Sequence, residues 1–246
     1  GWCAFDYHTH YDFGSGDRIC YHGVYDMFRN PKFASTVYSS QMDTDKKIIL
    51  EPITIYARGE RAIGGITPLM ISTNCDYVEV YFKDIMIAKE YPATNKYPGL
   101  KHPPIIINIE QNIPGVSSMN WEDLKVIGYI NGKAEIERKY LKNPTFKELQ
   151  IFSDDKEINS INEGAAWDST KITIKAVDSW GNRLPYINEA INIEVKGAGE
   201  LIGNDNPVLE GGYYSFWVKT NTKKGIIKIT VSNKRVESKS IEIKVK

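Results

Sequence analysis

The chain has 246 residues, of which 41% are hydrophobic and 25% charged, and its 31 basic residues balance 31 acidic ones. A chain of zero net charge creates no overall field toward nucleic acid or an anionic membrane, so we expect neither as a partner. No apolar run approaches the roughly 20 residues of a membrane-spanning helix, and the polar first residues are not a signal peptide. These features leave the compartment open, with the cytoplasm slightly favoured.

The three cysteines, Cys3, Cys20 and Cys75, are an odd number and lie far apart in the sequence. They form no C-x-x-C pair, so the spacing indicates neither a disulfide framework nor a zinc ribbon. We expect three reduced thiols, most of them buried, and neither a metal nor a cofactor.

Residues 1–41 differ in pattern from the rest of the chain. A short apolar start precedes the polar stretch "HTHYDFGSGDR", and Phe33, Val37 and Tyr38 then recur at helical spacing. Pro31 suits the first position of that helix. The pattern predicts a strand, a long loop and a helix. One such unit cannot bury a core alone, so we expect it to be the last unit of a larger domain whose earlier part lies upstream.

Short runs with alternating apolar residues follow residue 41, and each predicts a strand. The runs are "ITIYA", "PLMIS", "YVEVYF", "IMIAKEY", "PIIINI", "LKVIGYI" and "AEIERKY". Asn131-Gly132 lies between the last two, which predicts a tight hairpin because both residues tolerate positive φ.

A second series of strands begins near Thr145. It consists of "KELQIFS", "KITIKAV", "AINIEVKG", "YYSFWVKT", "GIIKITVS" and "KSIEIKVK", with the turn-rich connections "DSWGNRLPY" and "VKGAGELIGNDNP" between them. Each run alternates with period two, so one face of each strand can be buried. We predict a mainly β chain of two immunoglobulin-like β-sandwich domains, residues 42–144 and 145–246, after the strand-loop-helix segment 1–41.

Two patterns in the first segment resemble glycoside hydrolase family 2, which includes β-galactosidases and β-glucuronidases. Trp2 and Asp6 match a tryptophan followed four residues later by aspartate at the end of the eighth barrel strand. "GVYDMFRNPK", from Gly23 to Lys32, matches the family's Gly-[Val/Leu/Ile]-x-x-x-x-Arg-x-Pro-Lys pattern before the helix. Residues 1–41 therefore resemble the last βα unit of a (β/α)₈ catalytic barrel.

The resemblance extends over nearly the whole chain. "TNCDYVEVYFKDIMIAKEYP" resembles the immunoglobulin-like domain that follows the barrel, with Lys83-Asp84 in place of the usual Asn-Gly turn. "AVDSWGNRLPYINEAINIEVKGAGELIGNDNPV" resembles the additional immunoglobulin-like or invasin-like C-terminal domain of many β-galactosidase-like members.

The resemblance implies a retaining glycosidase, which uses two carboxyl groups about 5 to 5.5 Å apart. In the family both are glutamates on earlier barrel strands, so the resemblance places both catalytic residues upstream of residue 1. We therefore expect this chain alone to be inactive. Its implied partners are a carbohydrate substrate and the missing N-terminal part of the same barrel, and the sugar itself stays unspecified.

Trp2 and Asp6 are the first candidate substrate-binding residues. The resemblance assigns Trp2 to the floor of the sugar subsite, where an indole face contacts the apolar face of a sugar. The other interpretation is that Trp2 belongs to the barrel core. Asp6 either accepts hydrogen bonds from sugar hydroxyls or fastens the strand to its loop.

Tyr7, His8 and His10 are further candidate substrate-binding residues, because they follow the carboxyl end of the strand, where barrel enzymes place their substrate loops. His8 and His10 also form a His-x-His pair of the kind that binds metals, with Asp17 and His22 as possible further ligands. Two histidines do not define a metal site, so substrate binding is the favoured hypothesis.

Aromatic residues in the sandwich segments could form a carbohydrate-binding surface. The candidates are Trp121, Trp167, Trp180, Tyr213, Tyr214 and Trp217. Alternation in "YYSFWVKT" puts Tyr214, Phe216 and Val218 on one face, so packing in a core or at a domain interface is the favoured explanation. The alternative to a glycosidase fragment is a non-catalytic immunoglobulin-like module that binds carbohydrate or protein.

Overall fold

The computed structural model describes residues 3–10, 18–56, 66–113, 121–161 and 166–246. The chain divides into two compact units, Gly1–Asn143 and Pro144–Lys246. Each unit has its own hydrophobic cluster. The assignment of residues 1–41 to a separate domain stays a prediction.

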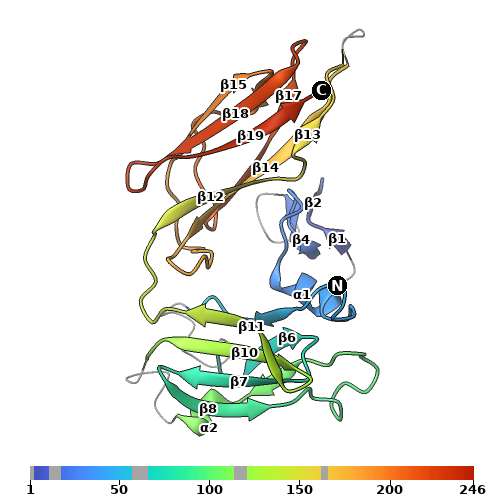
Figure 1. The fold of residues 1–246 in the computed structure, drawn as a ribbon, viewed down its shortest axis with the longest axis vertical. Coiled ribbons are helices and arrows are strands. Elements are labelled where there is room, and N and C mark those ends of the chain that lie inside the picture. The colour runs from blue at the N-terminus through green and yellow to red at the C-terminus, as the bar shows by residue number, and fades with distance from the viewer. Residues whose placement is uncertain (1–2, 11–17, 57–65, 114–120, 162–165) are drawn as a thin grey trace. The chain divides into compact units, whose positions relative to one another are not determined.

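The first unit begins with two small sheets and a short helix. Strand β1 (Cys3–Phe5) pairs in parallel with β4 (Gly23–Tyr25), and β2 (Tyr7–His8) pairs antiparallel with β3 (Ile19–Cys20). Helix α1 (Phe33–Ser39) follows and packs beside β4 (Figure 1). The predicted order of strand, loop and helix is confirmed, and β2, β3 and β4 are additions that the sequence pattern did not indicate.

The start of α1 corrects the prediction for Pro31. The helix begins at Phe33, and the capping residue Lys32 has extended backbone (φ −93°, ψ 169°). Pro31 instead forms an antiparallel bridge with Tyr25, so it lies outside the helix. The apolar residues of α1 are only partly covered, and Tyr38 is 57% exposed.

A β-sandwich forms the rest of the first unit. Its larger sheet has the order β11-β10-β7-β8 and its smaller sheet the order β5-β6-β9. The strands are β5 (Leu50–Pro52), β6 (Leu69–Thr73), β7 (Tyr77–Phe82), β8 (Ile85–Glu90), β9 (Ile105–Ile107), β10 (Leu124–Ile130) and β11 (Lys133–Tyr140), and a one-turn helix, α2 (Ile109–Asn112), follows β9. Alternate residues of β7 and β10, such as Val78, Val80, Leu124 and Val126, are fully buried between the sheets. The period of two in the sequence therefore identified the core face.

The prediction of a strand at "ITIYA" is wrong, because the strand lies earlier, at Leu50–Pro52. The Ile53 N–H donates to the Met70 carbonyl, and the backbone then turns away, with Tyr56 at a φ of 51°. Tyr56 is buried and stacks on Trp121, with ring centroids 4.2 Å apart. This pair belongs to the core, as favoured for Trp121.

Both predicted two-residue hairpins of the first unit are confirmed. Ile130 pairs with Lys133 across Asn131 (φ 52°) and Gly132 (φ 75°), the two positive φ angles of a type I′ turn. Phe82 pairs with Ile85 across the other turn, where Lys83 has a φ of 59°. The strand pairing is thus kept although this turn lacks Asn-Gly.

The second unit is a β-sandwich of two sheets, ordered β12-β14-β17-β16 and β13-β19-β18-β15. Its strands are β12 (Glu148–Ser153), β13 (Glu157–Ile158), β14 (Ser169–Val177), β15 (Asn192–Gly197), β16 (Gly199–Ile202), β17 (Tyr213–Thr220), β18 (Gly225–Ser232) and β19 (Lys239–Val245). Phe216 and Val218 of β17 are buried in the core, and Tyr214 packs against it. The mainly β fold with two sandwiches is therefore confirmed.

Two predictions for the second unit need correction. Gly199–Ile202 was expected to be a turn-rich connection, but it pairs antiparallel with β17 as strand β16. For Trp167 and Trp180, packing in a core or at a domain interface was expected; at 50% and 42% exposed, they do not lie in the core. Neither side chain lies on an alternating strand run, so the period-two argument did not apply to them.

The cysteines and the helices agree with the sequence analysis. Cys3, Cys20 and Cys75 are free thiols, and the latter two are buried. Burial raises the pKa of the Cys75 thiol. None of the helices in the described ranges has the length and apolar character needed to cross a bilayer.

The end of α1 is tied to the sandwich of the first unit by Gln41. Its amide donates to the His102 carbonyl (2.9 Å) and accepts from the His102 N–H (3.0 Å). The next segment is held by Asn74, whose Nδ2 donates to the carbonyls of Met42 (3.0 Å) and Lys47 (2.8 Å). The helix therefore has an attachment that the sequence pattern did not predict.

We expect His102 to make the stability of the first unit depend on pH. Burial lowers the pKa of His102, the Lys101 ammonium lowers it further, and Nε2 is buried without a hydrogen-bond partner among the described residues. An unfolded histidine titrates near pH 6.5, so just below that pH the unfolded state binds more protons and stability falls as pH falls. Melting temperatures at pH 7.5 and 5.5 should show this loss, and His102→Gln should reduce it. An unchanged pH dependence in this variant would contradict the assignment.

Candidate functional site

The candidate site lies at the carboxyl end of β1, where Asp6 follows Phe5 and precedes Tyr7 and His8 of β2. The Asp6 N–H donates to the Tyr25 carbonyl of β4 (3.0 Å), which continues the parallel pairing by one residue. Trp2, the predicted floor of a sugar subsite, lies outside the described residues. Its role stays a prediction.

Asp6 is the most constrained residue of this site. Its Oδ1 accepts a hydrogen bond from the Gly23 N–H (2.9 Å) and lies 2.6 Å from the Lys32 ammonium. The Asp6 side chain is only 2% exposed and that of Lys32 is 32% exposed. These contacts favour the interpretation in which Asp6 fastens the strand to the chain that returns after the loop.

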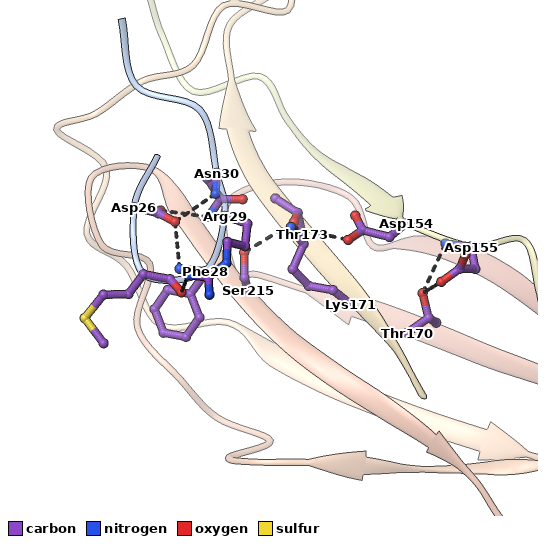
Figure 2. Close-up of polar contacts among 11 residues, drawn as sticks. Asp26, Phe28, Arg29, Asn30, Asp154, Asp155, Thr170, Lys171, Thr173 and Ser215 are labelled. Atoms are coloured by element: carbon purple, nitrogen blue, oxygen red, sulfur yellow. Dashed lines mark hydrogen bonds and ion pairs between the residues drawn. The ribbon is translucent and has the colours of Figure 1, made fainter. Parts of the chain in front are cut away.

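The turn before α1 places Lys32 and Arg29. Asp26 Oδ1 accepts from the N–H groups of Phe28 and Asn30, both at 2.8 Å, as Figure 2 shows. The Asp26 N–H in turn donates to the Asn30 carbonyl (2.9 Å). Arg29, at a φ of 67°, sets its guanidinium 3.6 Å from the centre of the Phe5 ring. This closed turn places the Arg29 guanidinium on Phe5 of β1 and the Lys32 ammonium beside Asp6, which follows β1.

The two halves of the sequence pattern therefore meet in space. Asp6 contacts Lys32, and Phe5 contacts Arg29, although the partners are more than 20 residues apart. The sequence pattern included Arg29 and Lys32 but gave them no role at the site. The signal that could have identified them was the presence of two cations in a motif that accompanies an aspartate at a strand end.

A glycine is required at position 23. A Cβ atom there would lie 2.2 Å from the Asp6 nitrogen and 2.2 Å from the Phe5 carbonyl carbon. No side chain fits at that distance, so the close approach of β4 to the end of β1 depends on Gly23. The Gly23 N–H can reach the Asp6 carboxylate for the same reason.

Tyr7, His8 and His10 are solvent exposed, Tyr7 by 44%. Tyr7 pairs with Cys20 and His8 with Ile19 across the β2-β3 hairpin. A hydrogen bond with the Cys20 side chain is the main cause that raises the pKa of Tyr7. The structure thus presents exposed polar rings beside the buried Asp6.

The geometry of the described residues does not support metal binding by His8 and His10. The described residues include no group of three or more histidine, cysteine, aspartate or glutamate side chains arranged to hold an ion. His22, one of the possible further ligands, is exposed, and Asp17 lies outside the described residues.

An apolar cavity of about 520 Å³ lies between β1, β4 and α1. Its lining includes Cys3, Ala4, Val24, Tyr25, Tyr38 and Met42. A parallel sheet is normally covered on both faces, and here the covering on one face is incomplete. This cavity is therefore a place where further secondary structure can pack.

Comparison with known proteins agrees with the geometry. Residues 153–242 match the domain family described as "Glycoside hydrolase family 2 C-terminal domain 5". The chain is 49% identical over 216 residues to a β-galactosidase of Thermoanaerobacterium thermosulfurigenes, an alignment that covers 86% of this chain and 30% of that protein. The chain belongs to glycoside hydrolase family 2. The resemblance noted in its sequence is confirmed.

Other family 2 relatives are also much longer than this chain. It is 37% identical to a β-galactosidase of Thermoanaerobacter pseudethanolicus, and the alignment covers 100% of this chain and 33% of that protein. The crystal structure of a β-glycosidase from Bacteroides vulgatus superposes with a TM-score of 0.74 at 18% identity, over 99% of this chain and 30% of that one. This likeness supports the fold. The chain thus spans about a third of the length of these proteins.

The turn before α1 recurs in the second unit, at residues 178–182. Asp178 Oδ1 accepts from the N–H groups of Trp180 and Asn182, both at 2.9 Å, and the Asp178 N–H donates to the Asn182 carbonyl (3.0 Å). The fourth residue again has positive φ, 80° at Gly181. "DMFRN" and "DSWGN" therefore fold into the same closed turn.

We expect the aspartate of each turn to stabilise that turn alone, so that its removal speeds amide exchange only within its own unit. Asp26→Ala removes two hydrogen-bond acceptors from the first turn and should speed amide exchange at residues 26–32 by about tenfold or more. Asp178→Ala is the matched variant and should do the same at residues 178–183. Hydrogen exchange with mass spectrometry measures both. Unchanged amide exchange of the first turn in Asp26→Ala would contradict this prediction, because the other contacts of the turn would then hold it closed without the aspartate.

Proposed function

We propose that the chain is the C-terminal part of a retaining, β-galactosidase-like glycosidase that hydrolyses O-glycosidic bonds. The observation that carries this proposal is the 49% identity over 216 residues to a protein named β-galactosidase. The contact between the two halves of the barrel motif, through Asp6 and Lys32, supports it independently.

In this proposal residues 1–41 are the last βα unit of a (β/α)₈ barrel, and the rest of the barrel lies upstream in the same protein. The parallel pairing of β1 with β4 and the apolar cavity beside α1 support this assignment. A full barrel takes about 250 residues, so this chain supplies only its last part. Residues 42–144 and 145–246 are then immunoglobulin-like domains that support the barrel.

The proposed substrate is a carbohydrate bound at the carboxyl end of β1. Trp2 supplies the apolar floor under the sugar ring, and Tyr7, His8 and His10 offer hydrogen-bonding groups to its hydroxyls. The exposure of Tyr7, His8 and His10 supports this role. Asp6 acts as a positioning residue, because its carboxylate is buried and already bonded to Gly23 and Lys32.

Catalysis in this proposal requires two glutamates that this chain does not supply. A retaining glycosidase needs an acid/base and a nucleophile about 5 to 5.5 Å apart, and both stand on earlier barrel strands in this family. The chain therefore contributes to substrate binding and to the stability of the barrel, while bond cleavage depends on the upstream part.

A second candidate function is a non-catalytic carbohydrate-binding or protein-binding module in the C-terminal unit. The observation that favours it is the exposure of Trp167 and Trp180, at 50% and 42%. Exposed indole rings offer flat apolar surface for sugar rings. Binding of oligosaccharides to the chain in calorimetry, lost in Trp180→Ala, would favour this function.

The decisive experiment compares the chain with the full-length protein that contains it. A panel of nitrophenyl glycosides should give no turnover with the chain alone and hydrolysis of the β-galactoside with the full-length protein. NMR of the first-formed sugar should show retention of the anomeric configuration. Turnover by the chain alone would contradict the placement of both catalytic residues upstream.

Trp2 provides a test of the proposed subsite within the active full-length protein. Trp2→Ala removes the stacking surface and should lower kcat/KM by roughly tenfold to a hundredfold, the equivalent of about 1.4 to 3 kcal/mol of lost transition-state stabilisation. Tyr91→Ala, which removes an exposed aromatic ring that lies in no candidate site, is the control and should leave kcat/KM unchanged. Equal effects of the two variants would argue against a special role for Trp2.

A further inference from the structure

The Lys32 ammonium contacts both ends of the hairpin that carries the candidate substrate-binding residues. It lies 2.6 Å from Asp6 Oδ1, at the start of the hairpin, and donates to the Tyr21 carbonyl (3.2 Å), at its end. Between these ends, Tyr7 pairs with Cys20, His8 pairs with Ile19, and the Thr9 N–H donates to the Arg18 carbonyl (2.8 Å). One side chain from the turn before α1 thus closes the base of the hairpin.

The two contacts of Lys32 differ in kind. The contact with Asp6 neutralises a buried carboxylate, and removal of the lysine alone would leave that charge without a cation. The contact with Tyr21 is a hydrogen bond to a neutral carbonyl, which ties down the returning chain but compensates no charge. A variant that also removes the charge of Asp6 therefore separates the effect of Lys32 on the stability of the fold from its effect on the hairpin.

We propose that Lys32 is a positioning residue for the sugar subsite: by holding Asp6 and Tyr21 together, it fixes the hairpin on which Tyr7, His8 and His10 stand. This inference rests on the proposed function. In this arrangement Lys32 acts through the hairpin, because its ammonium already binds Asp6 and the Tyr21 carbonyl. Its effect on substrate binding is transmitted through the backbone of the hairpin.

Kinetics of the full-length protein test the positioning role. In Lys32→Met we expect KM for the nitrophenyl β-galactoside to rise about fivefold or more while kcat changes less than about twofold, since the catalytic glutamates lie on other strands. In the double variant Asp6→Asn/Lys32→Met, the side-chain carbonyl introduced at position 6 still accepts from Gly23 and no buried charge remains. The melting temperature should therefore recover, while KM should stay raised. Recovery of KM together with the melting temperature would overturn the proposal, because Lys32 would then only stabilise the fold.

Hydrogen exchange on the chain itself gives a second readout that needs no activity. The Thr9 amide should exchange at least about tenfold faster in both variants, whereas the Gly23 amide should regain its protection in the double variant. Lys196→Met is the control, since Lys196 pairs with Glu194 (2.7 Å) on the exposed face of β15 in the other unit. Normal protection of Thr9 in Lys32→Met would overturn the positioning role, even if the full-length protein hydrolysed none of the glycosides and the proposed function failed.

Discussion

The ion pair between Asp6 and Lys32 joins the two ends of a segment that has little other core. Around it, β1 and β4 approach so closely that only Gly23 fits, and the turn at residues 26–30 directs Arg29 onto Phe5. The backbone pairing of β1 with β4 and the contact of Arg29 with Phe5 connect the same parts of the segment. The spacing of the family motif follows from this geometry, since Lys32 and Arg29 of one half contact Asp6 and Phe5 at the other.

Most of the strands could be predicted from the sequence because their signal is local. β17 and β18 have the predicted bounds, since alternating apolar residues and flanking turn residues define each strand without reference to its neighbours. Gly199–Ile202 lacks such a signal because its four residues lie among glycines, and its strand geometry comes from pairing with β17. The run "ITIYA" failed for the opposite reason: it alternates, but Tyr56 turns into the core to stack on Trp121.

The candidate site was predictable in its location but not in its contacts. The residue types after β1 pointed to a strand end with polar rings, and the structure places Tyr7, His8 and His10 there in solvent. The sequence left two roles open for Asp6, because its burial depends on Lys32, which lies 26 residues further along the chain. Contacts of that range follow from the path of the backbone, which a pattern of residue types does not contain.

The attachment of Gln41 to His102 has a consequence for the exchange of modules between related enzymes. A domain border placed after residue 41, as the sequence pattern suggests, would separate Gln41 from His102, with which its amide forms two hydrogen bonds. The hydrogen bonds of Asn74 to Met42 and Lys47 would stay within the second domain. Recombination that keeps these pairs together must therefore transfer the end of α1 along with the sandwich that follows it. In the descent of such proteins, helix α1 would be inherited together with the sandwich that follows it.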